Sequence, residues 1–293
     1  MKKRDFIYII SAILLVFWLI SSHFSERILQ NHVDDEKKII AETGILSVHV
    51  QDVGNADSVF IQLPDGKTAL IDGAERENAD SIIDYIDTCG AEKIDYLIAT
   101  HPHSDHIGGL AEIIESFEIG QVFMPNVVHT TSDFENMIDA IESKSIPVTQ
   151  AKDGQILFEG NNYIAECFSP IEENYENLND YSVILKLTYK DKSFLFTGDA
   201  EKDVEKAVVK KYGNKLKSDV LKVGHHGSNT STCREFLKAV SPETGIISVG
   251  TGNDYGHPHK EVLERLEKFD VGILRTDKLG TVVIKTDGFD WRE

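Results

Sequence analysis

The densest group of metal-binding side chains lies in residues 100–109, whose sequence is THPHSDHIGG. His101 and His103 are two residues apart on an extended segment, so both imidazoles project to one side and can close on one cation. Asp105 and His106 follow at a helix start, where they point toward a second cation and where an acidic side chain suits the helix dipole. These ligand types suit zinc, and also manganese or iron. The pattern predicts a metal centre rather than a polar loop with accidental histidines.

The flanking residues predict where this group lies in the fold. Residues 94–99 form an apolar run with β-branched side chains, as in a buried strand, and residues 110–115 have the pattern of a helix. Gly108 and Gly109 allow the backbone to approach closely beneath the group. The metal-binding residues are therefore expected on a strand-to-helix turn.

Residues 100–109 resemble the signature of the metallo-β-lactamase superfamily in its hydrolase version, and further motifs of that family occur downstream. The resemblance implies that Asp199, at the end of FLFTGD, bridges two metal ions. It implies that His225, in VGHHGS, completes one metal shell, and that His226 is either a ligand or a partner of one. It also implies that His257, in YGHPH, closes the second metal site or faces the substrate.

The resemblance implies two divalent cations, zinc or alternatively manganese, with a complete ligand set. The expected ligands are His101, His103 and His225 on one cation, Asp105, His106 and His257 on the other, and Asp199 between them. The residues expected to act in catalysis are Asp105, Asp199 and His257. A water shared by the cations, whose pKa falls from about 16 toward about 7, would supply hydroxide near neutral pH.

Five other residues are expected near this centre. Asp72 is expected to accept hydrogen bonds that orient a ligand histidine. Asp180 lies in the region where the superfamily's middle histidine is absent, and it either supplies an oxygen ligand or stays outside the site. Contacts with the substrate or its leaving group are expected from Ser228, Asn229 and His259.

The particular motifs resemble those of the ComEC-type group, which includes the extracellular hydrolase domain of the DNA-uptake competence channel. The match covers about residues 45–286. It departs from the group at Asn55 and Ala56, which replace the Gln-Gly of the usual opening motif DVGQGDS and can alter the loop on the substrate side. Residues 179–182, with the sequence NDYS, have the ComEC-type form of the region that lacks the middle histidine.

These features predict a metal-dependent hydrolase and leave three functions open. The ComEC-type resemblance favours a phosphodiesterase or nuclease that acts on DNA outside the cell, including single-stranded DNA. The acidic composition favours a phosphoester of the cell wall or of lipid, as a phosphorylcholine-esterase-like enzyme would cleave. The third function is a non-catalytic binding module on the same fold. A β-lactamase proper is disfavoured because the middle histidine is missing.

The formal net charge of −19 over 293 residues separates this chain from most nucleic-acid-binding proteins, which are basic. An acidic surface suits the solubility of an external domain. No stable binding of nucleic acid is therefore expected, although two divalent cations would add positive charge at the mouth of the site.

The three cysteines, Cys89, Cys167 and Cys233, are far apart in the sequence and match no metal motif. They are expected to be small core residues. A disulfide between two of them stays open, because pairing depends on distances that a sequence does not show.

The N-terminal residues predict a membrane anchor. Residues 6–20 are apolar apart from Ser11, and an extension to residue 24 brings the stretch close to the ~20 residues that cross a bilayer. Lys2, Lys3 and Arg4 precede it, which places the N-terminus inside the plasma membrane and the rest of the chain outside.

The expected organisation is an anchor at residues 1–23, a stalk at 24–44 and the hydrolase domain at 45–293. The anchor makes the protein single-pass and the catalytic domain extracellular. The alternative is a cleaved secretory signal and a secreted protein, although no convincing cleavage site follows.

Beyond the stalk, strand and helix patterns alternate in two halves. Strands are expected at 45–53, 58–63, 68–71, 94–99, around 156, and at 163–168, 183–197, 220–223, 246–249, 272–275 and 281–285. Helices are expected at 79–88, 110–115, 134–143, 201–211, 232–239 and 260–268. Two such halves with ligands at strand ends fit the α/β fold of the superfamily, a four-layer αβ/βα sandwich, here with one N-terminal transmembrane helix.

Overall fold

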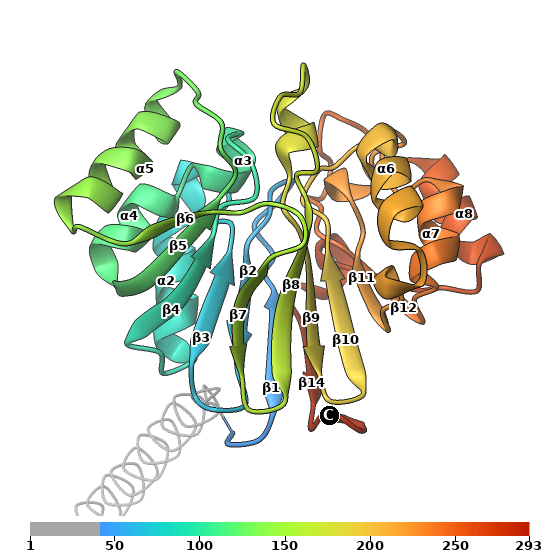
Figure 1. Ribbon diagram of the computed structural model, residues 1–293, viewed down its shortest axis with the longest axis horizontal. Helices are drawn as coiled ribbons and strands as arrows, with labels where there is room; N and C mark the ends of the chain where they lie inside the picture. The colour runs from blue at the N-terminus through green and yellow to red at the C-terminus, as the bar shows by residue number, and fades with distance from the viewer. Residues whose placement is uncertain (1–41, 293) are drawn as a thin grey trace, which may run out of the picture. The chain divides into compact units, whose positions relative to one another are not determined.

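Two β-sheets face each other in the computed structural model, which describes residues 42–292 (Figure 1). The first sheet contains, in spatial order, β15 (Trp291–Arg292), β14 (Val282–Thr286), β1 (Leu46–Val50), β2 (Val59–Gln62), β3 (Thr68–Ile71), β4 (Lys93–Ile98), β5 (Glu118–Met124) and β6 (Val148–Gln150). The second contains β13 (Gly272–Arg275), β12 (Thr244–Ile247), β11 (Val220–Lys222), β10 (Lys192–Phe196), β9 (Ile184–Tyr189), β8 (Tyr163–Ser169) and β7 (Ile156–Gly160). Neighbouring strands are parallel from β3 to β6 and from β10 to β13, and antiparallel elsewhere.

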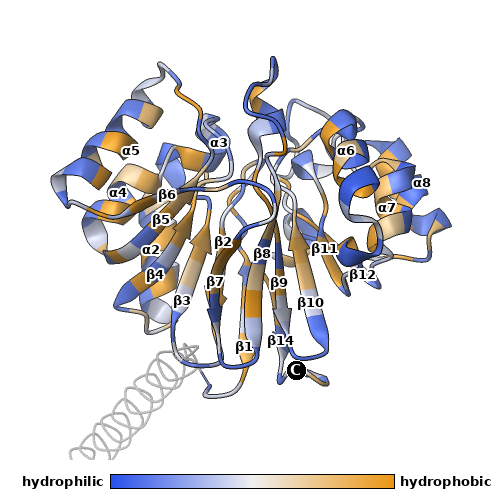
Figure 2. Ribbon diagram, viewed as in Figure 1, coloured by the Kyte–Doolittle hydropathy of each residue, from blue (hydrophilic) through white to orange (hydrophobic). Residues whose placement is uncertain are grey.

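The core follows from the alternation of strand side chains between the two faces of a sheet. In β2, Val59 and Ile61 belong to a buried cluster with residues of both sheets, whereas Phe60 is buried outside that cluster. In β10, Phe194 joins the same cluster and Leu195 joins a second one with the helices. Several strands, such as β3 and the upper part of β10, are accordingly apolar over much of their length (Figure 2).

Helices cover the outer faces of both sheets (Figure 1). Within the first half they are α2 (Ala79–Thr88), α3 (Ser104–Ile107), α4 (Leu110–Ser116) and α5 (Ser132–Ser143). Within the second half they are α6 (Lys202–Tyr212), α7 (Arg234–Val240), α8 (Lys260–Lys268) and α9 (Thr276–Leu279). Short 3₁₀ helices are η1 (Arg76–Asn78), η2 (Leu178–Tyr181), η3 (Gly213–Leu216) and η4 (His225–Gly227).

The outer helices bury one side and expose the other. In α8, Val262 and Leu266 are buried one turn apart, as an amphipathic helix requires. Lys260 and Glu264 form an exposed ion pair on the same helix at 3.1 Å. The expected αβ/βα sandwich with two facing sheets is therefore confirmed for residues 42–292.

Two local differences from the sequence prediction have physical reasons. The strand expected at 45–53 ends at Val50, because the chain turns at Gly54, whose φ of 79° suits glycine. The prediction missed β5 and β6. In β5, Gly120 and Gln121 interrupt the apolar pattern, and all three residues of the edge strand β6 are exposed.

The expected transmembrane helix and anchor at 1–23, with most of the expected stalk, lie outside the described residues. Within residues 42–292, no helix combines the length and apolar character that a membrane span needs. Cys89, Cys167 and Cys233 are buried and free, which confirms them as core residues without a disulfide.

Candidate metal centre

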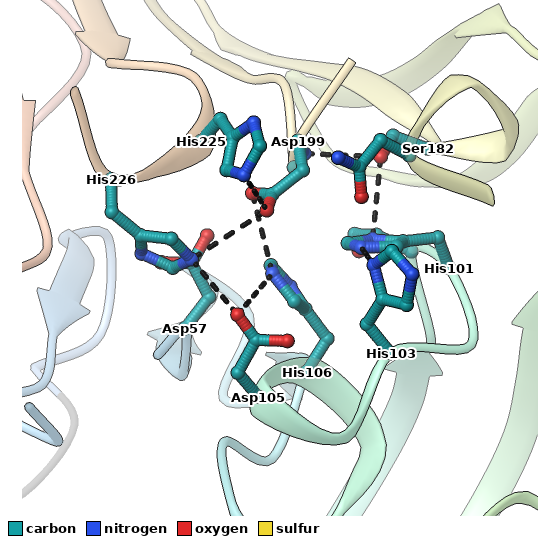
Figure 3. A network of polar contacts seen from close by, with 12 residues as sticks. Asp57, His101, His103, Asp105, His106, Ser182, Asp199, His225 and His226 are labelled. Atoms are coloured by element: carbon teal, nitrogen blue, oxygen red, sulfur yellow. Dashed lines mark hydrogen bonds and ion pairs between the residues drawn. The ribbon is translucent and has the colours of Figure 1, made fainter. Parts of the chain in front are cut away.

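The carboxyl ends of four strands bring the candidate residues together. β3 and β4 are parallel neighbours in one sheet, and β10 and β11 are parallel neighbours in the other. The loops that follow the two strands of each pair therefore lie at the same edge of their sheet. Asp72 follows β3, His101 lies beyond β4, Asp199 lies beyond β10 and His225 lies beyond β11. Figure 3 shows these loops converging, with histidines from both halves of the chain around Asp199.

His101 and His103 direct ring nitrogens at a common point (Figure 3). Nε2 of His101 and Nδ1 of His103 lie 3.1 Å apart. Two nitrogens that share a tetrahedral zinc ion would lie about 3.3 Å apart, given zinc–nitrogen bonds of about 2.0–2.1 Å. Nδ1 of His101 contacts Thr100 Oγ1 at 3.1 Å and Ser182 Oγ at 3.3 Å, which fixes the ring. The pair thus has the separation of two ligands on one cation.

Asp199 lies between imidazoles of two loops (Figure 3). Its Oδ1 is 3.3 Å from His106 Nε2, and its Oδ2 is 3.5 Å from His225 Nε2 and 3.6 Å from His226 Nε2. Its backbone N–H donates to Ser182 Oγ at 3.0 Å and holds the loop. Asp199 would therefore be available to a cation held by either loop.

Four side chains, here named the central group, bring ligand atoms close together. One ligand atom from each of Asp105, His106, Asp199 and His226 lies within 4.8 Å of all the others. His106 Nε2, His226 Nε2 and Asp199 Oδ1 are buried and have no hydrogen-bond partner among the described residues. An unpaired buried polar atom costs about 1–3 kcal/mol, whereas a divalent cation takes these atoms as ligands. The residues present therefore fit a cation in the central group.

The second nitrogen of each central imidazole sets its tautomer. His106 Nδ1 donates to Asp72 Oδ2 at 2.7 Å, and His226 Nδ1 donates to the carbonyl of Ser248 at 3.1 Å. Because both acceptors require a proton on Nδ1, the lone pair on Nε2 of the neutral ring faces the central group. Both rings are oriented as cation ligands.

The electrostatics of the centre favour positive charge. Burial lowers the pKa of His106, but Asp199, Asp105 and Asp72 outweigh burial and hold that pKa well above its ordinary value. Burial raises the pKa of Asp199, but His106 and the adjacent histidines hold it well below its ordinary value. At His101, burial and then His106 lower the pKa well below the ordinary value. Bound cations would neutralise the negative charge of the carboxylates, and the imidazoles could then stay neutral.

Asp72 orients His106. It is fully buried, and its oxygens accept from the backbone N–H of Thr100 at 2.8 Å, the Thr100 hydroxyl at 2.7 Å and His106 Nδ1 at 2.7 Å. These three hydrogen bonds place it behind the imidazole, on the side away from the central group. The sequence predicts this supporting position.

Replacing Asp72 with asparagine is expected to weaken cation binding about 10–100-fold. The amide has one acceptor oxygen for the three donors, so it cannot hold His106 in the same tautomer. Calorimetric titration of zinc into the metal-depleted protein measures the effect. Asp219→Asn is the matched control, because Asp219 also accepts an N–H and a hydroxyl, those of Ser193 at 2.7 and 2.8 Å, at the amino end of β11. Unchanged affinity in Asp72→Asn would contradict the orienting role.

A buried ion pair contacts His226 on its Nδ1 side, away from the central group. Lys222 Nζ lies 2.8 Å from Asp57 Oδ2, and both side chains are at most 5% exposed. Asp57 Oδ1 is 3.4 Å from His226 Nδ1, and the Asp57 backbone N–H donates to the Asp105 carbonyl at 3.0 Å. The motif at residues 52–58 therefore helps to hold His226 and Asp105 in place through Asp57.

The turn that carries His225 and His226 is strained. Both residues have positive φ, 50° and 52°, which costs of order 1–3 kcal/mol for a side chain other than glycine. The His225 N–H donates to the Gly198 carbonyl at 3.1 Å and ties this turn to the Asp199 loop. The strain occurs where two consecutive imidazoles must both reach Asp199.

Glycines under the histidine cluster permit the close backbone packing that the sequence predicts. A Cβ on Gly108 would lie 2.5 Å from the Ser104 carbonyl oxygen, and one on Gly109 would lie 2.4 Å from the Gly73 carbonyl oxygen. No side chain fits at these distances, so the helix start can sit against the β3 loop only with glycine.

An open pocket of about 350 Å³ lies over the centre. It is lined by Asn55, Glu75, His103, Ser104, Asp105, Asn179, Asp199, His225, His226, Tyr255 and His257. None of these lining residues is a lysine or an arginine, and bound cations would add positive charge for an anionic substrate.

His257 faces this pocket beside the central group. Its ring centroid is 5.8 Å from that of His225 and 6.4 Å from that of His226, and its Nδ1 is buried without a hydrogen-bond partner among the described residues. Burial, and then His226, His225 and His259, lower the pKa of His257 to about 4, so the ring is neutral at pH 7. The geometry places His226 rather than His257 with Asp105, and it favours the substrate-facing alternative for His257.

Of the two alternatives for Asp180, the structure favours a position outside the metal centre. Its Oδ1 accepts from the backbone N–H of Glu201 at 3.3 Å, ahead of α6. Its neighbour Asn179, also in η2, lines the pocket.

The substrate contacts expected from Ser228, Asn229 and His259 stay a prediction, and the structure shows what these residues contact within the chain. Ser228 Oγ contacts Thr230 Oγ1 at 3.1 Å within its own turn. The backbone N–H of Asn229 donates to His259 Nδ1 at 3.0 Å. The turn thus has hydrogen bonds of its own, and none of the three residues lines the pocket described above.

Sequence reasoning places Asn55 in a loop on the substrate side, and Asn55 lines the pocket. It misses Glu75 and Tyr255 as pocket residues, because Tyr255 is visible only as part of YGHPH. Glu75 carried no signal, because it follows β3 in a polar loop without a motif.

Comparison with known proteins decides the family. Residues 52–251 match the Metallo-beta-lactamase superfamily, a span that contains every member of the central group. This protein belongs to the metallo-β-lactamase superfamily. Its fold and its His/Asp cluster, suited to two metal ions, are those of a metal-dependent hydrolase family.

Relatives within the superfamily place the chain in the ComEC-type branch. ComE operon protein 3 of Bacillus subtilis (strain 168) is 31% identical over 252 residues, which cover 80% of this chain and 32% of that protein. Competence protein ComA of Neisseria gonorrhoeae is 29% identical over 237 residues, which cover 80% of this chain and 32% of that protein. The chain thus spans about a third of the length of these curated relatives.

A solved structure shows the same fold. CmlA, a diiron beta-hydroxylase from Streptomyces venezuelae, superposes with a TM-score of 0.55 at 14% sequence identity, over 82% of this chain and 54% of that chain. At this identity the likeness concerns the fold alone.

Proposed function

We propose that this protein is a phosphodiesterase that works with two divalent cations, zinc or alternatively manganese. One observation carries the proposal: the His101–His103 pair and the central group lie side by side under an open pocket. The ring centroids of His101 and His106 are 4.1 Å apart, and Asp199 turns one oxygen toward each histidine-bearing loop.

Different residues of the chain would bind the cations and transfer protons. His101 and His103 would hold one cation, the central group the other, and the two oxygens of Asp199 are available to both. Bound cations would supply a water of lowered pKa and positive charge for the phosphodiester oxygens. His257 faces the pocket as a neutral imidazole, which can accept or donate a proton beside the substrate.

Two substrate classes follow from different observations. The names of the competence-protein relatives favour a phosphodiester of DNA. The acidic chain and the lack of lysine and arginine in the pocket lining favour a small phosphoester, such as a cell-wall or lipid-derived one. A short phosphodiester, or one at the end of a DNA chain, is consistent with both observations.

The test uses the full-length chain in detergent, loaded with zinc or with manganese. It is offered bis(4-nitrophenyl) phosphate, single-stranded DNA and the chromogenic lactam nitrocefin, each with and without a chelator. We expect chelator-sensitive cleavage of the diester and none of the lactam. Cleavage of the diester but not of DNA would select the small-phosphoester class. Bound metal without any hydrolysis would contradict the proposal and support a non-catalytic binding module.

We also propose that residues 1–23 anchor the protein in the plasma membrane with the hydrolase domain outside the cell. The apolar run behind Lys2, Lys3 and Arg4 supports this placement. Protease added to intact cells should digest the domain while the N-terminus stays with the membrane fraction. A domain protected in intact cells, or one released to the medium, would contradict the proposal.

A further inference from the structure

One aromatic side chain is exposed at the mouth of the metal pocket. Tyr255 is 69% exposed, and among the exposed large apolar side chains of residues 42–292 it alone lines this pocket. Its ring stacks on that of His257, with centroids 5.6 Å apart and an interplanar angle of 20°. One face of the tyrosine is thus supported by the protein, and the other is free for a ligand.

The loop that carries Tyr255 is held in place by Asn253. The Asn253 amide nitrogen donates to the carbonyls of Gly250 at 2.9 Å and His257 at 2.7 Å, and its oxygen accepts from the His257 N–H at 2.9 Å. These bonds close the turn on both sides of the tyrosine. The ring is therefore positioned before any ligand arrives, which lowers the cost of binding.

Two side-chain amides in the same pocket offer unused polar atoms. Asn55 Oδ1 and Asn179 Oδ1 are buried and have no hydrogen-bond partner among the described residues. Both residues line the pocket with Tyr255. A ligand here meets a flat aromatic face and hydrogen-bonding amides, and no cationic side chain.

We propose that Tyr255 is a stacking platform for a nucleobase attached to the phosphodiester that is cleaved. A nucleobase has a flat π-face for the tyrosine and polar edges for the amides of Asn55 and Asn179. The substrate class is then a nucleoside phosphodiester rather than an aliphatic wall or lipid ester. This inference rests on the proposed phosphodiesterase activity, and it adds specificity to the same site.

The test compares substrates with one leaving group and different second substituents. These are methyl 4-nitrophenyl phosphate, thymidine 5′-(4-nitrophenyl) phosphate and its 3′ isomer, with the zinc-loaded full-length chain. The wild type should prefer at least one thymidine ester. Tyr255→Ala should lower the ratio of kcat/KM for that ester to kcat/KM for the methyl ester about tenfold or more, the size expected for stacking on one base. Tyr255→Phe should keep the ratio, because the ring remains.

The ratio separates this inference from its alternatives. A general disturbance of His257 lowers both rates and cancels in the ratio. Phe289→Ala is the control, since Phe289 is an exposed aromatic residue, 56% exposed, that does not line the pocket. A wild type that cleaves all three esters with equal kcat/KM, or an unchanged ratio in Tyr255→Ala, would overturn the stacking role. No cleavage of any ester would overturn the proposed phosphodiesterase instead.

Discussion

Asp199→Ala should lose bound metal and lower kcat/KM for bis(4-nitrophenyl) phosphate by at least about 10³-fold. The reason is geometric, since Asp199 has one oxygen 3.3 Å from His106 Nε2 and the other 3.5 Å from His225 Nε2. Metal content by elemental analysis and steady-state kinetics measure the two effects.

The fold should survive this change. The backbone N–H of Asp199, which donates to Ser182 Oγ at 3.0 Å, remains in the alanine variant and keeps the loop in place. Asp203→Ala is the matched control, because that carboxylate is 96% exposed at the start of α6. If Asp199→Ala retained both metal and rate, Asp199 could not lie between two cations.

His226→Asn should weaken cation binding by at least about 100-fold, more than the loss expected when only a residue that orients a ligand is changed. His226 Nε2 lies 3.4 Å from Asp105 Oδ2 and 3.6 Å from Asp199 Oδ2, inside the central group. Asparagine is the suitable replacement, because it tolerates the φ of 52° at this position better than alanine does. Titration with zinc and with manganese measures the change.

His257→Asn is the companion variant, and it should keep cation affinity within about tenfold while it lowers kcat. His257 lies in the pocket lining and outside the central group. The opposite outcome, with His257→Asn losing metal and His226→Asn retaining it, would restore the ligand assignment predicted from sequence. Near-ultraviolet circular dichroism of both variants checks that each is folded.

Several features of the site follow from local sequence because the residues share one short segment. His101 and His103 are two apart on an extended stretch, and period-two geometry sends both rings to one side whatever the rest of the fold does. Gly108 and Gly109 in the same segment predict tight backbone packing for the same reason. The apolar runs before Asp199 and His225 likewise predict strand ends, and the sandwich of alternating strands and helices is confirmed.

Assignments that join distant segments could not be made in this way. His226 and His257 are both histidines in motifs beyond strand ends, and the sequence favoured His257 as the partner of Asp105. The choice depends on the turn at His225 and His226, where two consecutive residues with positive φ send both rings toward Asp199. A local pattern does not reveal such strained backbone, because its cost is balanced by contacts elsewhere in the fold.

The residues around the pocket also show what local sequence predicts and what it does not. The polar turn at Ser228 and Asn229 closes on itself through His259, whereas Asn55, Asn179 and Tyr255 reach the pocket from three separate loops. The sequence by itself determined which side chains can bind metal and that they stand at strand ends, because residue type and local periodicity are encoded in adjacent positions. Only the tertiary structure decided which of them meet and what surrounds them, because distances between loops depend on sheet register and turn geometry summed over the whole chain.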